Sequence, residues 1–305
     1  MNNNFITIKQ AQDLELIRDI VAPAIGNVSD IEPCVSEACN SYAYLLNKHL
    51  IVKFAKDDAK LEKLLLEKNV LSFLKGKTTL KIPESTVFKN HFTFSIHEMI
   101  QGETFQNKHY QRLAPPRKDK FCHDVALFMY ELHSLTDKIN TPNLPQLKGI
   151  AGLYPLNGIK EFFKKRNELT RQEQNFVTRF CDEFTNHSQI SKNAFGHFDI
   201  QPKNIAFDFA EDKISGIYDF GDCGFCDISY DFTKFAIQYN PEILNNVLKH
   251  YQNLSGLKLN VPAILSNSTY CVLHCLMKDI EKNRSPNRGL YELRLKISQQ
   301  ENFPY

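Results

Sequence analysis

The 305-residue sequence lacks a hydrophobic run of membrane length and a clear excess of either charge. No apolar segment approaches the roughly 18 residues that a helix needs to cross a bilayer, which excludes a membrane-spanning protein. The 37 basic and 35 acidic residues leave a formal net charge of +2, which argues against a general nucleic-acid binder. Residues 1–15 contain no apolar stretch of the signal-peptide type. We therefore expect a soluble, cytoplasmic protein with neither a nucleic-acid nor a membrane partner.

Glycine is scarce, with 12 residues, and the eight cysteines are scattered along the chain. A reducing compartment makes structural disulfides rare. Cys223 and Cys226 have the spacing of half a zinc site, but the second closely spaced pair, Cys271 and Cys275, falls inside an apolar helical pattern. We interpret the cysteines as small buried hydrophobic residues and assign no metal to them.

Hydrophobic periodicity divides the chain into a β-rich part and a mainly helical part. The first part is predicted to contain a helix, a hairpin, a second helix and a second hairpin, over residues 13–25, 41–54, 58–75 and 87–96. After Gly102 the pattern becomes mostly helical, over residues 119–135, 157–186, 230–253 and 262–282. We therefore predict a small β-rich lobe followed by a larger helical lobe, with the boundary near residues 101–103.

One stretch of the second part, residues 194–231, is strand-like, loop-like and rich in acidic residues. It reads Gly-His-Phe-Asp-Ile-Gln-Pro-Lys-Asn over residues 196–204, and two short apolar runs later it reads Asp-Phe-Gly-Asp over residues 219–222. Two strands joined by a charged turn would bring Asn204 and Asp219 to neighbouring chain ends. Asp199, on the loop just before, is expected to face the same point.

Phosphoryl transfer requires this set of groups. One carboxylate orients the attacking hydroxyl and accepts its proton, while an amide oxygen and a second carboxylate hold Mg²⁺ on the phosphates. Acids gathered at one site imply a cation or a basic partner, because an unpaired buried carboxylate is costly. Each motif is common by itself, but the ordered combination of H-x-D-x-x-x-x-N, a short hairpin and D-F-G is specific. It predicts Asp199 as the catalytic carboxylate and Asn204 and Asp219 as metal ligands.

With these motifs, and with Asp227, Tyr230 and Asp231 behind them, the chain resembles the aminoglycoside phosphotransferase and choline kinase family. These proteins are small-molecule kinases with a protein-kinase-like fold, and the resemblance extends over nearly the whole chain. It implies an α+β, bilobal fold. The nucleotide-binding N-lobe is expected at residues 1–101, and the catalytic and substrate-binding C-lobe at residues 102–305.

The resemblance also implies the reactants. The phosphoryl donor is expected to be ATP or GTP with Mg²⁺ as the cofactor, and the acceptor a small-molecule alcohol. Asp222 and Asp231 are expected to contact this substrate together with Asp199. No protein partner is implied.

Residues of the N-terminal part resemble the nucleotide site of this family. Lys53 resembles the strand lysine that holds the phosphates, and Glu67 resembles the helix glutamate that pairs with it. Glu62, on the same helix, is the less favoured alternative for that ion pair. The segment Glu98, Met99 and Ile100 resembles the hinge whose backbone binds the base.

The loop expected over the phosphates departs from the kinase pattern, which fills this loop with glycine. The chain has no glycine between Gly26 and Gly76. The equivalent positions include Ser36, Asn40 and Ser41, whose backbone N–H groups and hydroxyls are predicted to bind the nucleotide instead.

The identity of the acceptor stays open at this point. Overall resemblance favours an aminoglycoside-type antibiotic, but the acidic run that some members carry soon after the position of Asp231 is missing here. A metabolite alcohol such as choline, homoserine or a sugar is the alternative. A protein kinase is disfavoured, because no Ala-Pro-Glu and no long activation segment follow Asp219. A binding module without turnover is supported only by the glycine-free loop.

Two further groups are interpreted as structural. His133 and His197 are expected to make hydrogen bonds that brace the fold and the catalytic loop. The basic residues near the C-terminus are interpreted as the solvated face of a terminal helix: Lys282, Arg284, Arg288, Arg294 and Lys296.

Overall fold

The protein is seen here in a computed structural model that describes residues 5–34, 41–89, 91–184 and 192–302. The chain forms two compact units, and each is assembled from separate segments. The first unit contains Met1–Thr104, Lys138–Leu144 and Asn204–Cys223. The second contains Phe105–Asp137, Pro145–Lys203 and Gly224–Tyr305.

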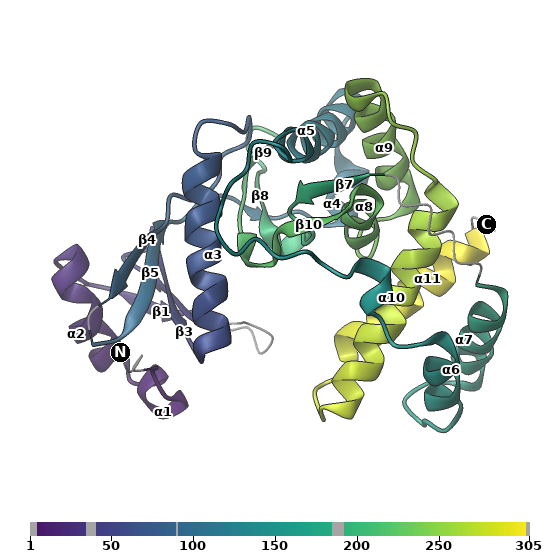
Figure 1. The fold of residues 1–305 in the computed structure, drawn as a ribbon, viewed down its shortest axis with the longest axis horizontal. Coiled ribbons are helices and arrows are strands. Elements are labelled where there is room, and N and C mark those ends of the chain that lie inside the picture. Colours follow the sequence, from purple (N-terminus) through teal and green to yellow (C-terminus); the bar gives the residue numbers. More distant parts are fainter. Residues whose placement is uncertain (1–4, 35–40, 90, 185–191, 303–305) are drawn as a thin grey trace. The chain divides into compact units, whose positions relative to one another are not determined.

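A five-stranded antiparallel sheet in the order β1-β2-β3-β5-β4 forms the centre of the first unit (Figure 1). Its strands are β1 (Ile31–Pro33), β2 (Ser41–Leu46), β3 (Leu50–Ala55), β4 (Thr86–Lys89) and β5 (Thr93–Glu98). Asn47 and Lys48 adopt positive φ angles of 49° and 60° in the turn between β2 and β3. Both predicted hairpins, β2 with β3 and β4 with β5, are confirmed.

Three helices accompany this sheet, and the longest lies alongside it (Figure 1). They are α1 (Ile8–Ala11), α2 (Leu14–Ile25) and α3 (Asp58–Leu74). The Asp57 side chain begins α3 by accepting a hydrogen bond from the backbone N–H of Lys60. The face of α3 that is buried is mostly leucine and valine, but it also includes Glu67. A carboxylate in this position needs a partner, because burial of an unpaired charge is costly.

The segment Asn204–Cys223 adds a second sheet to the first unit. This sheet has the order β6-β8-β9, with β6 (Glu103–Thr104), β8 (Ile205–Asp208) and β9 (Lys213–Ile217). The hairpin predicted between Asn204 and Asp219 is therefore confirmed. A short 3₁₀ turn, η3 (Phe220–Asp222), follows it.

The second unit is mainly helical, with one two-stranded sheet of β7 (Asn193–Gly196) and β10 (Gly224–Asp227). Its α-helices are α4 (Asn107–Arg112), α5 (Pro115–Ser134), α6 (Leu156–Lys164), α7 (Arg171–Glu183), α8 (Ile228–Phe235), α9 (Pro241–Ser255), α10 (Val261–Glu281) and α11 (Asn287–Asn302). The predicted α+β fold class, β-rich toward the N-terminus and mainly helical toward the C-terminus, is confirmed. The lobe boundary at residue 101 stays a prediction. Within the described ranges, no helix is long and apolar enough to span a bilayer.

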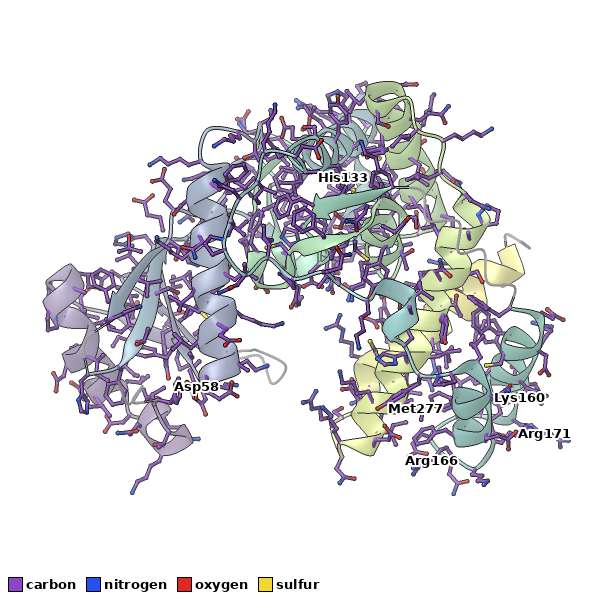
Figure 2. The ribbon with its side chains drawn as sticks, viewed as in Figure 1. Asp58, His133, Lys160, Arg166, Arg171 and Met277 are labelled. Atoms are coloured by element: carbon purple, nitrogen blue, oxygen red, sulfur yellow. The ribbon has the colours of Figure 1, made fainter. Side chains whose placement is uncertain are left out.

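Two of the predicted long helices are each interrupted. The segment predicted as one helix over 157–186 forms α6 and α7, because Thr170 and Glu173 make a capping box that begins α7. Figure 2 shows Lys160, Arg166 and Arg171 at this pair of helices. The segment 230–253 forms α8 and α9, since Asn240 caps a new helix at Pro241.

The prediction of a solvated basic face near the C-terminus is wrong for one of its five residues, Lys296. Lys296 has no exposed surface, and its Nζ donates hydrogen bonds to the carbonyl of Ala236 and, at 3.2 Å, to Gln299 Oε1. Arg288 and Arg294 each pair with a buried glutamate. Lys282, Arg284, Arg288 and Arg294 are all exposed as predicted, with the side chains of the two paired arginines 51% and 58% exposed.

The interpretation of the cysteines as small buried residues is confirmed for five of them. These are Cys122, Cys181, Cys223, Cys226 and Cys271.

Candidate active site

A buried ion pair joins β3 to α3 in the first unit. The Nζ atom of Lys53 lies 3.0 Å from both carboxylate oxygens of Glu67, and the two side chains are 17% and 8% exposed. A bidentate pair in this environment fixes the lysine ammonium at one position on the sheet. The glutamate that pairs with Lys53 is therefore Glu67, which the sequence pattern favours over Glu62.

Glu67 also binds the turn that follows Asp219. Its Oε1 accepts a hydrogen bond of 3.2 Å from the backbone N–H of Phe220. Asp219 itself adopts the left-handed conformation, with φ 68° and ψ 64°, which a residue other than glycine takes up only when its surroundings enforce it. One carboxylate thus sets the positions of both Lys53 and Asp219.

Asn204 and Asp219 lie at neighbouring ends of the β8/β9 hairpin. The backbone N–H of Tyr218 donates to the carbonyl of Asn204 at 3.1 Å, which closes the hairpin immediately before Asp219. Asn204 is 2% exposed. These two residues supply an amide and a carboxylate oxygen, the donor types that Mg²⁺ takes when phosphates and water complete its coordination. The donor set therefore fits a Mg²⁺ ion held jointly by protein and nucleotide.

Burial and the charges of Lys53 and Asp219 shift the pKa values of two neighbouring side chains. Burial lowers the pKa of His97 on β5, and the positive charge of Lys53 lowers it further. Burial and the negative charge of Asp219 raise the pKa of Tyr218. Both shifts favour the uncharged form of a side chain that borders the Lys53 and Asp219 charges.

The remaining predicted nucleotide residues are only partly described. Glu98 ends β5, and the backbone N–H of Met99 donates to the carbonyl of His49 at 2.7 Å. The N–H of Met99 is therefore already used within the protein. The predicted contacts with the base would have to come from the other backbone groups of Glu98, Met99 and Ile100. Ser41 is the first residue of β2, whereas Ser36 and Asn40 lie outside the described residues.

Asp222, a predicted substrate ligand, forms an ion pair with Lys63 of α3. The two side chains are 48% and 40% exposed, so the pair lies at the surface of the first unit. A surface ion pair contributes little to stability. Asp222 is thus placed in the first unit, next to the turn that Glu67 holds.

The second unit contains the loop of Asp199. His197 is fully buried, and its Nδ1 accepts a hydrogen bond of 3.2 Å from the backbone N–H of Asp199, which places the imidazole proton on Nε2. The bracing role predicted for His197 is confirmed. The two carboxylate oxygens of Asp199 have different partners, the side-chain amide of Gln201 at Oδ1 and the Lys203 ammonium 3.5 Å from Oδ2.

Asp231, at 0% exposure, holds this loop from behind. Its oxygens accept the backbone N–H groups of His197 at 3.2 Å and Phe198 at 2.9 Å. His133 of α5 lies 3.4 Å from Asp231 Oδ2 and 2.8 Å from the Tyr251 hydroxyl, which confirms its structural role (Figure 2). Asp231 has no exposed surface and lies behind the loop of Asp199, and its predicted contact with the substrate stays a prediction.

Two backbone features allow Asp231 to approach. Phe198 adopts a φ of 56°, an uncommon conformation for a bulky residue, and turns both neighbouring N–H groups toward the carboxylate. Gly196 leaves the necessary space, since a Cβ atom there would lie 2.6 Å from Asp231 Oδ2. The sequence predicted the loop but not this support, because nothing in the local pattern links Asp231 to residues 196–198.

The structure assigns the predicted catalytic and metal residues to different units. Lys53, Glu67, Asn204 and Asp219 belong to the first unit, while Asp199 belongs to the second. The predicted approach of Asp199 to the other four stays a prediction. Sequence reasoning also missed Gln201 and Arg288, which bind each other in the second unit.

Comparisons with known proteins identify the family and the fold. Residues 30–263 match a family model described as the phosphotransferase enzyme family. The structure is similar to that of aminoglycoside 2'-phosphotransferase-IIIa in its GDP complex, with a TM-score of 0.75, 18% identity, and coverage of 95% of this chain and 99% of that chain.

Two further solved structures share the fold. The gentamicin complex of APH(2")-IIa has a TM-score of 0.67 and 21% identity, and covers 92% of this chain and 95% of its own. The macrolide 2'-phosphotransferase of Brachybacterium faecium has a TM-score of 0.63 and 9% identity, and covers 92% and 98%. At these identities the similarity shows the fold alone.

Proposed function

Because the chain belongs to the phosphotransferase enzyme family, whose model matches residues 30–263, we propose that it transfers the γ-phosphoryl group of ATP or GTP to a hydroxyl of an aminoglycoside-type antibiotic. The observation that carries the nucleotide part is the double contact of Glu67. This carboxylate binds the Lys53 ammonium and the backbone N–H next to Asp219, so the phosphate-binding cation and the metal-binding carboxylate are fixed by one group.

The residues divide the reaction between them. Lys53 would bind the nucleotide phosphates, and Asn204 and Asp219 would hold Mg²⁺. When bound, Mg²⁺ neutralises charge on the phosphates. Asp199 orients the acceptor hydroxyl and accepts its proton as the new O–P bond forms and the bond from the γ-phosphorus to the β,γ-bridging oxygen breaks, which releases ADP or GDP. The hydrogen bond from Gln201 and the ammonium of Lys203 set the direction in which that carboxylate points.

The aminoglycoside acceptor is supported by structurally similar proteins that were solved in complex with kanamycin and gentamicin. One observation favours a metabolite alcohol as a second candidate. The Lys203 ammonium lies 3.5 Å from the Asp199 carboxylate, so the catalytic group faces a positive charge, which disfavours an acceptor with several ammonium groups.

The experiment that tests the proposal is a transfer assay with ATP and with GTP in Mg²⁺, against kanamycin, gentamicin, choline, homoserine and a sugar alcohol. Asp199→Asn should lower kcat by about 10²–10⁴-fold, the usual contribution of a general base. Asp208→Asn is the matched control, since Asp208 also lies in the acidic stretch but binds backbone N–H groups of the β8/β9 turn. Failure of the wild-type protein to bind any nucleotide in Mg²⁺ would refute the proposal.

A further inference from the structure

A chain of side-chain hydrogen bonds joins α11 to the catalytic carboxylate within the second unit. Glu292 Oε1, in a residue that is 4% exposed, accepts from Arg288 Nε at 2.9 Å. Arg288 Nη2 then donates to Gln201 Oε1 at 2.8 Å. Gln201 Nε2 in turn donates to Asp199 Oδ1. In each of these three hydrogen bonds a donor group faces an acceptor group.

The chemistry of the groups fixes the direction of this chain. A guanidinium only donates hydrogen bonds, and an ionised carboxylate only accepts them. The amide of Gln201 must therefore turn its oxygen toward Arg288 and its nitrogen toward Asp199. Without Arg288 the Asp199 carboxylate would still favour the amide nitrogen, but the amide oxygen would lose the donor that holds the far end of the Gln201 side chain in place.

Arg288 is itself held on two sides. Its Nε binds Glu292, and Glu292 is fixed by a second hydrogen bond from Gln238 Nε2 at 2.8 Å. The planar guanidinium thus spans Glu292 and Gln201 with two different nitrogen atoms, a geometry that a lysine ammonium does not reproduce. The rigid element behind Asp199 is therefore the first turn of α11, which begins at Asn287; Arg288 lies 87 residues after Gln201 in the chain.

We propose that Arg288 is a positioning residue that fixes the amide of Gln201 and, through it, the orientation of the Asp199 carboxylate. This inference rests on the proposed function, in which Asp199 accepts the proton of the acceptor hydroxyl. Arg288 does not need to touch either substrate for this role.

The kinetic test compares Arg288→Met and Arg288→Lys with Arg294→Met. Arg294 is the matched control, because it lies on the same helix and its Nε also binds a buried glutamate, Glu173, at 2.7 Å. Both Arg288 variants should lower kcat by about 10- to 100-fold, the cost of a small misplacement of a reacting group, with each KM within about twofold of wild type. Arg294→Met should retain the wild-type kcat.

A double-variant cycle shows whether Arg288 acts through Gln201. If it does, Arg288→Met should lower kcat no further once Gln201→Leu is present. Additive losses, an acceptor KM that rises while kcat is unchanged, or an Arg288→Lys variant with wild-type kcat would each overturn the inference and leave the proposed function standing.

A measurement without turnover separates this inference from the proposed function. The side-chain amide resonances of Gln201, assigned by their loss in Gln201→Leu, should shift in Arg288→Met and stay in place in Arg294→Met. If the wild-type protein transfers no phosphoryl group but this shift is seen, the proposed function fails while the link from Arg288 to Gln201 stands. If the resonances are unchanged in Arg288→Met, the inference fails whatever the activity.

Discussion

The buried carboxylate of Asp231 gives the sharpest test of how the catalytic loop is held. Asp231→Ala removes the carboxylate that accepts hydrogen bonds from two buried backbone N–H groups, those of His197 and Phe198. Each unsatisfied buried donor costs about 1–3 kcal/mol, so the free energy of unfolding should fall by about 2–6 kcal/mol. The total free energy of unfolding of a typical domain is about 5–15 kcal/mol, so this loss is a large part of it.

An intermediate substitution makes the expectation quantitative. Asp231→Asn keeps one oxygen acceptor but turns an NH₂ group toward the other backbone N–H, so it should cost about half as much as Asp231→Ala. Asp227→Ala is the matched control, because Asp227 is also an aspartate of this segment but caps α8 from a half-buried position. Loss of a cap costs about 0.5–2 kcal/mol.

Urea denaturation gives the stability, and native-state hydrogen exchange reports on the two amides themselves. The N–H groups of His197 and Phe198 should exchange faster in Asp231→Ala than in Asp227→Ala. The reasoning is refuted if Asp231→Ala is no less stable than Asp227→Ala and both amides remain protected. Catalytic activity should fall with the same ranking, since the φ of 56° at Phe198 is sustained by these bonds.

Three other outcomes are expected. Asp219→Ala should abolish phosphoryl transfer while the thermal midpoint stays near that of the wild type, and full activity in a folded variant would contradict the metal assignment. Gly196→Ala should destabilise the protein in urea by about 1–3 kcal/mol, because the added Cβ would lie 2.6 Å from Asp231 Oδ2, and unchanged stability would show that the loop adapts. Burial lowers the pKa of Lys296 to about 7, so between about pH 7 and pH 10 the unfolded state binds more protons and the wild-type stability should rise relative to Lys296→Met. A constant difference across that range, measured by urea denaturation, would show that Lys296 stays charged when folded.

Much of the nucleotide half of the candidate site could be predicted from the sequence. The hairpin between Asn204 and Asp219 follows from two short apolar runs and a charged turn, and the pairing of Lys53 with Glu67 follows from the family pattern. The hairpin is a local feature of the sequence. The ion pair connects a strand and a helix whose order along the chain is characteristic of the family. The break between α6 and α7 was missed, although Thr170 and Glu173 carry the spacing of a capping box.

The supports of the catalytic loop could not be predicted in the same way. Asp231 and Arg288 look like ordinary members of helical patterns, and their partners are set by how distant helices pack. The burial of Lys296 is similar, because a basic helix reads as solvated until its neighbours are known. Polar contacts across the tertiary structure leave no periodic signal in the sequence.

The assembly of the first unit from separate segments has a consequence for synthesis on the ribosome. Its sheet of β1 to β5 is complete once residue 98 has been made, but Glu67 receives its hydrogen bond from Phe220 only when the β8/β9 segment has followed. At about 5–20 residues per second, translation from residue 104 to residue 223 takes roughly 6–24 s. During this interval the nascent chain contains Lys53 and Glu67 but not the backbone N–H of Phe220 that binds Glu67 in the folded protein. A chaperone that binds early chains would therefore meet an N-terminal part whose nucleotide site is still unfinished.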